Sequence, residues 1–460
     1  MSQHTSAQIP PARAMSDKQR KFIIKLTALI SGGMLIDGFI LGAIGIVMPA
    51  ITHDLQLSLA WQGLIGASAL IGIFIGGPLG GYLADKIGRK PMFTLDLAIF
   101  LVGSVAQFFV TEGWQLFAVR VLMGVAIGAD YSIGWPLLAE FAPARLRGKL
   151  LCIQEVGWYV GYLLSYASGY VLTISHTANW NVILGLSTIP TVIVLLARLG
   201  TPESPRWLMS KGRRKEALAL ADEYMDPEER GDLEATPKAS NSRGFLQLFS
   251  PEYIKATVFV SVFWICNVTP YFAIGTFVPA VLEHLGLEDG LTAGLGINAI
   301  AVLGTLIAAA LIEKVGRRKL AIPPYGVATL SLLVVAFFYE ASPMVTVICF
   351  LTFSLANAIS TTLTGVYPGE VFPTEIRGVG VGFATATSRI GAAGGTFFLP
   401  FCMTQYGITT TVLIAAGISL FGWVVSYLLA PETKGKRLSE TSAPSATTRQ
   451  FSASSLEANR

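Results

Sequence analysis

Residues 81–90 read Gly-Tyr-Leu-Ala-Asp-Lys-Ile-Gly-Arg-Lys, and a related stretch, Glu-Lys-Val-Gly-Arg-Arg, occupies residues 313–318. Each stretch separates two long apolar runs, and the shared Gly-Arg pair returns after 228 positions, from Gly88 to Gly316. Two further pairs of segments keep nearly the same separation. They are Glu140–Gly148 with Glu370–Gly378, 230 positions apart, and Pro202–Arg206 with Pro431–Gly435, 229 positions apart. Chance similarity between short motifs would not preserve one offset, so the sequence predicts two homologous halves.

The composition indicates that most of the chain lies in a membrane. Of its 460 residues, 52% are hydrophobic and 13% are charged, whereas soluble domains carry about 25% charged residues. A helix needs about 20 mostly apolar residues to cross the ~30 Å hydrocarbon core. Twelve stretches meet this need, near residues 23–51, 62–84, 92–111, 115–139, 150–174, 180–200, 254–282, 291–312, 320–340, 344–367, 378–402 and 409–430. The predicted fold class is therefore an all-α polytopic membrane protein with 12 transmembrane helices in two pseudo-symmetric six-helix bundles.

Lysine and arginine occupy alternate loops, and basic loops stay on the cytoplasmic side of a membrane. The basic loops include residues 86–90, 145–149, 206–215, 314–319 and 377, whereas the loops between them hold no lysine or arginine. Both termini are basic as well, so both are predicted to be cytoplasmic, which requires an even number of spans. The net charge of +4 thus indicates orientation rather than affinity for nucleic acid. The polar first 21 residues lack the apolar segment of a cleavable signal peptide, so the first helix is expected to direct insertion.

These spans define five predicted segments. They are a cytoplasmic N-terminal tail over 1–21, an N-terminal bundle over 22–200, a cytoplasmic linker with short helices over 201–253, a C-terminal bundle over 254–431 and a cytoplasmic tail over 432–460. The four cysteines lie in apolar stretches and no C-x-x-C spacing occurs, so neither a disulfide framework nor a metal site is expected. No cofactor is expected. Neither H-E-x-x-H nor G-x-S-x-G occurs, and an intramembrane enzyme is the least supported class.

The repeated motifs resemble those of the major facilitator superfamily, and the resemblance covers residues 23 to about 437. The stretch at residues 81–90 is similar to the signature of its second loop, and the segments that begin at Pro202 and Pro431 are similar to its sugar-porter branch. The resemblance implies a monomer in a lipid bilayer, expected in a bacterial inner membrane, that works by alternating access. The sequence holds no Walker-type phosphate-binding motif, so transport is expected to be secondary rather than driven by ATP.

The resemblance also implies that the loop motifs gate the cytoplasmic side. The residues expected to do so are Gly81, Asp85, Gly88, Arg89, Glu140, Arg147, Glu203, Arg206, Glu370 and Arg377. Ion pairs among them at the ends of helices would hold the two halves together while the site faces outward. Exposed ion pairs are worth ~0–1 kcal/mol each, a size that suits a reversible gate.

Charged residues inside the predicted spans are candidates for function, because a charge at the membrane centre costs at least ~2.5–3.5 kcal/mol. Asp37 in the first span and Arg120 in the fourth match positions that interact in the resembling proton-coupled sugar porters. A carboxylate near an arginine can alternate between ion-paired and protonated states. These two residues and Glu155 of the fifth span are the predicted proton-coupling residues. A purely structural ion pair between Asp37 and Arg120 is the alternative.

Substrate binding is assigned to a second set of residues. Arg389 in the eleventh span can hold a carboxylate with two parallel hydrogen bonds, and organic anion transporters of the superfamily carry an arginine in a similar setting. Glu155 stands where sugar porters use a sugar-binding glutamine. The other members of the predicted set are Asp130, Tyr131, Trp158, Tyr159 and Asn267. Packing inside the bundle is the alternative for these.

The sugar-recognition pattern of the sugar porters is missing, because Cys266 and Asn267 stand at the position of their helix-7 glutamine pair. We therefore expect a proton-coupled importer of a small organic anion or related polar metabolite, with that substrate and protons as partners. A neutral sugar or polyol symporter and a proton-driven exporter of metabolites or drugs are the alternatives within the fold. A nutrient sensor is the alternative outside transport, although the expected tail after residue 431 is short for one.

Overall fold

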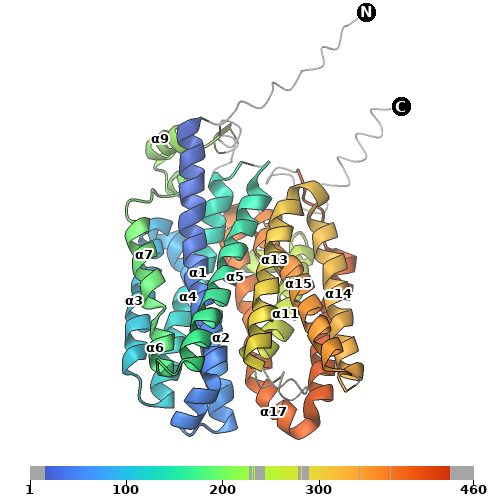
Figure 1. Cartoon of the computed structure of the whole chain (residues 1–460). Helices are drawn as coiled ribbons and strands as arrows, with labels where there is room; N and C mark the ends of the chain where they lie inside the picture. Colours follow the sequence, from blue (N-terminus) through green and yellow to red (C-terminus); the bar gives the residue numbers. More distant parts are fainter. Residues whose placement is uncertain are drawn as a thin grey trace, which may run out of the picture.

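The computed structural model describes residues 16–143, 145–226, 230–231, 233, 244–277, 281, 290–340, 342–372 and 374–435. Parts of the predicted tails and of the linker over 201–253 lie outside these ranges. Within them the regular structure is helical, with no strand. The helices gather in two bundles side by side, α1 to α7 in one and α11 to α17 in the other (Figure 1).

The first bundle begins earlier than its apolar run, at Asp17. Ser16 and Gln19 form a reciprocal capping box that fixes this start. The elements are α1 (Asp17–Asp54), α2 (Leu59–Ile87), α3 (Arg89–Ala106), the short 3₁₀ helix η1 (Gln107–Phe109), α4 (Gly113–Phe141), α5 (Arg147–Ile174), α6 (Trp180–Gly185) and α7 (Thr188–Arg198). The last two helices share one crossing, which is interrupted after Gly185.

The second bundle follows a linker of short helices. Its elements and those of the linker are α8 (Pro205–Ser210), α9 (Arg214–Tyr224), η2 (Gly244–Phe249), α11 (Ile254–Thr276), α13 (Gly290–Val315), α14 (Arg317–Phe338), α15 (Pro343–Thr361), α16 (Leu363–Val371) and α17 (Thr374–Leu429). Helices α15 and α16 form one crossing with a break at Thr362. Helix α17 contains two crossings joined at Gly407, whose φ of 77° is a conformation that glycine adopts without strain.

The count of crossings agrees with the sequence. Ten helical stretches of the described chain are long and apolar enough to span a membrane. One of them, Ile376–Leu429, holds two crossings on either side of Gly407, and α5 with its 28 residues adds one more. Twelve crossings in two bundles confirm the predicted fold class.

Helices α1 and α5 approach each other closely, which fixes the charged residues that both carry. A Cβ on Gly161 would lie 1.9 Å from the carbonyl oxygen of Leu35, and one on Gly38 would lie 1.9 Å from that of Trp158. Small residues let helix backbones approach closely inside a membrane. Side chains at these two positions would therefore force the helices apart.

Replacing Gly161 with alanine is expected to lower the thermal stability of the purified protein, because the added methyl group meets backbone atoms that cannot rotate away. Overpacking of this kind costs about 1–3 kcal/mol. Gly394→Ala is the matched control, since a Cβ there has no atom within 4 Å, and alanine favours the helix. Equal unfolding temperatures for the two variants in the same detergent would contradict the close α1–α5 contact.

Candidate functional site

Helices α2 and α17 line the boundary between the bundles on one side of the molecule. A Cβ on Gly63 would lie 2.6 Å from the carbonyl oxygen of Phe397, and one on Gly81 would lie 3.6 Å from that of Gly378. These contacts sit near opposite ends of the antiparallel helices. The halves therefore touch at both ends of this boundary.

Helices α5 and α13 make the same double contact on the other side. The backbone N–H of Lys149 donates to Glu313 Oε1 at 3.1 Å, and the hydroxyls of Tyr170 and Thr292 lie 2.8 Å apart near the opposite end. Among the described residues, the halves are thus in contact at both ends of both boundaries, as expected of an occluded conformation.

A small cavity remains at the centre of this boundary. It is lined by Tyr131, Trp135, Glu155, Trp158, Tyr159, Trp264, Val268, Tyr271, Phe272, Thr361, Thr364 and Arg389. Both halves contribute, through α4 and α5 on one side and α11, α15, α16 and α17 on the other. The free space measures about 20 Å³, which is room for about one water, so a metabolite enters only if the surrounding rings move apart.

Arg389 is the cation of this cavity. Its guanidinium carbon lies 5.3 to 5.9 Å from the ring centroids of Phe272, Tyr131 and Trp264, within the range of cation–π attraction. The side chain is only 3% exposed, yet its Nε and Nη1 atoms have no hydrogen-bond partner. Leaving buried donors unpaired costs free energy, so this guanidinium is ready to accept an anion.

Four of the other predicted substrate residues also line the cavity. They are Glu155, Tyr131, Trp158 and Tyr159. Trp158 Nε1 donates to the Tyr131 hydroxyl at 3.0 Å, which holds the two rings across the α4–α5 boundary. Glu155 contributes an acidic group to the same lining as Arg389.

Asn267 and Asp130 are exceptions, because neither lines the cavity. Asn267 Nδ2 donates to Ser360 Oγ at 3.0 Å, and its carbonyl oxygen accepts from Asn357 and Thr361. In this structure the amide of Asn267 joins α11 to α15, and its part in substrate binding stays a prediction. Asp130 points away from the cavity to an arginine on α7.

The predicted pair of Asp37 and Arg120 does not form. Arg120 donates from Nε to Ser68 Oγ at 3.2 Å and from Nη1 to the Ile40 carbonyl oxygen at 3.3 Å. The side chain of Asp37 is fully buried, and neither carboxylate oxygen has a hydrogen-bond partner. The reason is the rotation of α1, because the backbone near Ile40, three residues further along, meets α4 there.

Two further charged residues lie buried inside the first bundle and are not among the predicted site residues. Asp96 on α3 and Arg198 on α7 are both buried, and Arg198 bridges Asp96 and Asp130. Both residues fall inside predicted spans, so the cost of an intramembrane charge already marked them. Trp135 also lines the cavity, and no motif in the sequence marked it as a site residue.

The loop residues of the first half form a buried network. Arg89 Nη2 lies 3.1 Å from Glu140 Oε1, with side chains 9% and 2% exposed. Glu203 accepts from the backbone N–H groups of Arg89 and Lys90, both at 3.1 Å. Gly88 has a φ of 108°, and a Cβ there would lie 2.6 Å from Glu203 Oε2, so glycine is required for this contact.

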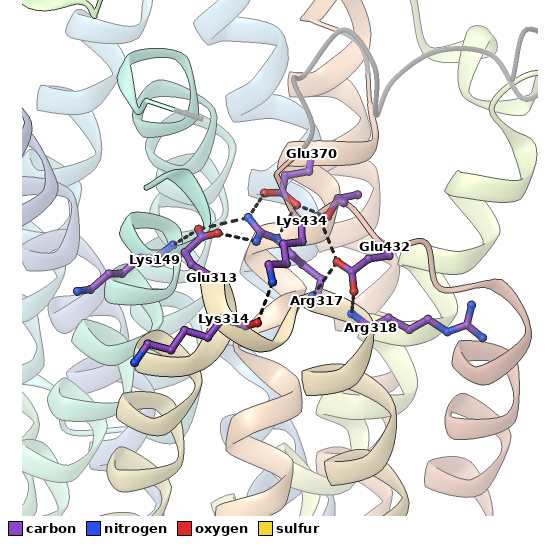
Figure 2. A network of polar contacts seen from close by, with 9 residues as sticks. Lys149, Glu313, Lys314, Arg317, Arg318, Glu370, Glu432 and Lys434 are labelled. Carbon is purple, nitrogen blue, oxygen red and sulfur yellow. Dashed lines mark hydrogen bonds and ion pairs between the residues drawn. The ribbon is translucent and has the colours of Figure 1, made fainter. Parts of the chain in front are cut away.

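The second half repeats this network (Figure 2). Arg317 Nη2 lies 2.8 Å from Glu370 Oε1, and Nη1 lies 2.9 Å from Glu313 Oε2. Glu432 accepts from the backbone N–H groups of Arg317 and Arg318, at 3.0 and 3.1 Å. Arg317, Glu370 and Glu432 thus take the places of the three partners in the first half, which gives the duplicated motifs one shared physical role.

Hydrogen bonds from backbone N–H groups in this network favour the ionised form of the Glu432 carboxyl group. Burial raises the pKa of the Glu432 carboxyl, but the backbone N–H groups of Lys434, Arg317 and Arg318 outweigh that effect and leave the pKa below its ordinary value. Lys434 also donates to the Lys314 carbonyl oxygen at 2.8 Å, which anchors the segment after α17 to the end of α13.

The geometry corrects the predicted gate in two respects. The ion pairs of Arg89 and of Arg317 lie within their own half and are largely buried, so the small value for exposed pairs does not apply. A direct hydrogen bond between the halves at this end runs from the backbone N–H of Lys149 on α5 to Glu313. The backbone of Asp85 belongs to α2, and its side chain lies outside the described residues.

The remaining gate arginines sit where the halves face each other. Arg147 donates to the carbonyl oxygens of Ala139 and Ala142, and Arg377 donates to that of Phe372. Both therefore satisfy carbonyl groups at the end of the preceding helix.

The fold and the site together define a polytopic transporter with a closed central cavity. A family model described as "Sugar (and other) transporter" matches residues 19–443. The chain therefore belongs to this family of the major facilitator superfamily, whose members carry metabolites or sugars across membranes.

Named relatives support this assignment. The chain is 39% identical to "Inner membrane metabolite transport protein YgcS" of Escherichia coli K12, over 92% of this chain and 95% of the relative. It is 28% identical to "Arabinose-proton symporter" of Bacillus subtilis 168, over 91% and 94%. A structure of the proton:xylose symporter XylE superimposes with a TM-score of 0.79 at 24% identity, over 92% of this chain and 99% of that one. This structural likeness shows the shared fold.

Proposed function

We propose that this protein is a proton-coupled importer of a small organic anion, with a carboxylate as the charged group and an apolar or aromatic body. The observation that carries the proposal is the buried Arg389 guanidinium at the boundary of the two halves, whose Nε and Nη1 atoms lack hydrogen-bond partners among the described residues. Each of these two donors forms a parallel pair with Nη2, and such a pair matches the two oxygens of a carboxylate. The metabolite transport protein of Escherichia coli and the proton symporter of Bacillus subtilis support the class and the coupling.

The aromatic lining supports an apolar body for the substrate. Trp158 and Phe272 stand at 5.9 Å between ring centroids, and Trp135 and Trp264 at 5.4 Å, each pair joining the two halves. Rings on both sides can hold a flat substrate by offset or edge-to-face contacts. A substrate held between the halves would stabilise the occluded conformation that alternating access requires.

Uptake into proteoliposomes under an imposed pH gradient tests the proposal. Benzoate and gluconate serve as carboxylate probes, and xylose and arabinose serve as neutral probes. Carboxylate uptake is expected to rise when the outside is acidic and to fall to the passive level when a protonophore removes the gradient. Uptake that is independent of pH, or movement of the neutral sugars alone, would contradict it. Protein-free liposomes with the same gradient correct for diffusion of the neutral acid.

A neutral sugar symporter is the second candidate, because Thr361, Thr364 and Tyr159 add hydroxyl groups to the cavity lining. These groups can donate to or accept from sugar hydroxyls. Neutral-sugar uptake in the assay above would favour it.

We further propose a monomer in a bacterial inner membrane, with both termini cytoplasmic and the bundles divided at 22–200 and 254–431. The alternation of basic loops supports this orientation. Ion pairing between Lys18 and Glu223, 2.8 Å apart, places the start of α1 beside α9, so the linker and the N-terminal end share one side (Figure 1).

A further inference from the structure

Four charged residues meet inside the first bundle, away from the central cavity. Asp37, Asp96, Asp130 and Arg198 come from α1, α3, α4 and α7, and each side chain is at most 3% exposed. We call these residues the carboxylate cluster. It contains three acids and one base, so it cannot be neutral while all three carboxyl groups are ionised.

Arg198 lies at the centre of the cluster. Its Nη1 is 3.2 Å from Asp96 Oδ2, and its Nη2 is 3.3 Å from Asp130 Oδ1. Its guanidinium carbon also lies 3.6 Å from the ring centroid of Phe93. The arginine is therefore held in place from two sides, and its single charge is shared by two acids.

Asp96 and Asp130 approach the same nitrogen of Arg198. Asp96 Oδ2 and Asp130 Oδ1 accept from Nη1 at 3.2 and 3.3 Å, and the backbone N–H of Leu97 donates to Asp96 Oδ1 at 2.6 Å. Two ionised carboxylates held at one nitrogen repel each other. One proton shared by the pair removes this repulsion and balances the charge against Arg198, as burial in a low-dielectric interior demands.

Asp37 is the third acid of the cluster. It follows Gly33 by four residues on α1 and so lies on the same helix face, and Gly33 packs against Arg198 and Asp130. Asp37 is fully buried, and within the described part of the chain neither of its carboxylate oxygens has a hydrogen-bond partner.

Helix α1 is packed tightly against the cluster, one turn before Asp37. A Cβ on Gly33 would lie 1.9 Å from Arg198 Nη2 and 2.6 Å from Asp130 Oδ2. A change in the charge or position of the cluster is thus transmitted directly to the helix that also packs on α5, the cavity wall.

We propose that Asp96, Asp130 and Arg198 form a proton-binding site in which the two acids share one proton, and that the contact of Gly33 with Arg198 couples this site to α1. Binding adds the proton to a carboxylate oxygen, and no other bond forms or breaks within the protein. The role in coupling rests on the transport function proposed above, whereas the shared proton does not depend on it.

Infrared difference spectroscopy on the purified full-length protein at neutral pH tests the site without any substrate. Subtracting the spectrum of Asp96→Asn from that of the wild type is expected to show the loss of a carboxylic-acid carbonyl band that shifts in D₂O. The remaining Asp130 then ionises and pairs with Arg198, so the carboxylate bands stay unchanged. Asp130→Asn is expected to give the same spectrum for the same reason.

Loss of a carboxylate band with no loss of an acid band, in either variant, would overturn the proposal. Asp222→Asn is the matched control, because Asp222 is an exposed partner of Arg230 and should lose only carboxylate absorption. Both cluster variants keep one acid opposite Arg198, and monodisperse elution with wild-type tryptophan fluorescence verifies their fold. If one variant misfolds, the other still decides the outcome.

The role of the site in transport is tested separately in proteoliposomes, with a probe that the wild-type protein takes up in the assay above. Asp96→Asn is expected to lose accumulation driven by the pH gradient while it keeps exchange of labelled for unlabelled probe. Gradient-driven accumulation equal to that of the wild type would overturn the role in coupling. If the infrared acid band depends on Asp96 but the wild-type protein shows no pH-dependent uptake, the proton site is upheld and the proposed function is refuted.

Discussion

Replacing Arg389 with glutamine is expected to abolish high-affinity uptake of carboxylates while the protein stays folded. Removing one partner of a buried, hydrogen-bonded charge pair costs about 2–5 kcal/mol of binding, so the apparent affinity should fall at least about 30-fold. The protein should stay folded, because Nε and Nη1 of Arg389 have no hydrogen-bond partner to lose among the described residues, and the change removes only its cation–π contacts with Tyr131, Trp264 and Phe272. Initial uptake rates over a range of probe concentrations, together with thermal unfolding, measure both effects.

Arg389→Lys is the matched variant for this test. It keeps the positive charge near Tyr131 and Phe272 but replaces the two parallel donors with one ammonium group. Partial recovery of uptake is expected, between the wild type and the glutamine variant. Neutral-sugar uptake, if it occurs, should only decrease slightly in either variant. Carboxylate uptake that survives Arg389→Gln unchanged would remove the main support for an anion transporter.

Replacing Arg317 with glutamine is expected to produce a large loss of stability. The change leaves Glu370 and Glu313 without the guanidinium that lies 2.8 and 2.9 Å from them. Breaking a buried ion pair by removing one partner costs about 3–5 kcal/mol. The unfolding temperature of the detergent-purified protein should therefore fall well below that of the wild type.

Arg318→Gln provides the control from the adjacent position. Its side chain is exposed and donates to the carbonyl oxygens of Ala430 and Tyr427, so a loss of only about 0.5–1.5 kcal/mol is expected. Arg89→Gln should resemble Arg317→Gln, because Arg89 holds the equivalent place in the first half. A similar stability for Arg317→Gln and Arg318→Gln would show that the buried network does not hold the second half together.

Much of the gate could be predicted from the sequence, because its partners lie in short motifs that recur at one offset. Arg89, Glu140 and Glu203 do contact one another, and Arg317, Glu370 and Glu432 repeat the arrangement. The sequence did not reveal that these pairs are buried or confined to one half. Burial depends on how the helix ends pack together, which no single loop motif encodes.

The lining of the central cavity was predicted in part. Arg389, Glu155, Tyr131, Trp158 and Tyr159 do line it, because an intramembrane charge or a cluster of aromatic residues is visible in the sequence. Other expected contacts do not form in this structure, because they depended on which residues face each other. Asn267 turns to α15, and Arg120 meets the backbone of α1 instead of Asp37.

The repeated loops of residues 81–90 and 313–318, with their constant offset, by themselves determined the duplication, the two bundles and, with the apolar runs, the twelve crossings. These features depend on local composition and on the length needed to cross the lipid. Only the tertiary structure decided that Arg198 joins Asp96 and Asp130, and that Gly33 of α1 packs against this cluster. The physical reason is that a membrane helix is apolar on nearly all faces, so its periodicity does not specify its rotation, and rotation decides which buried charges meet.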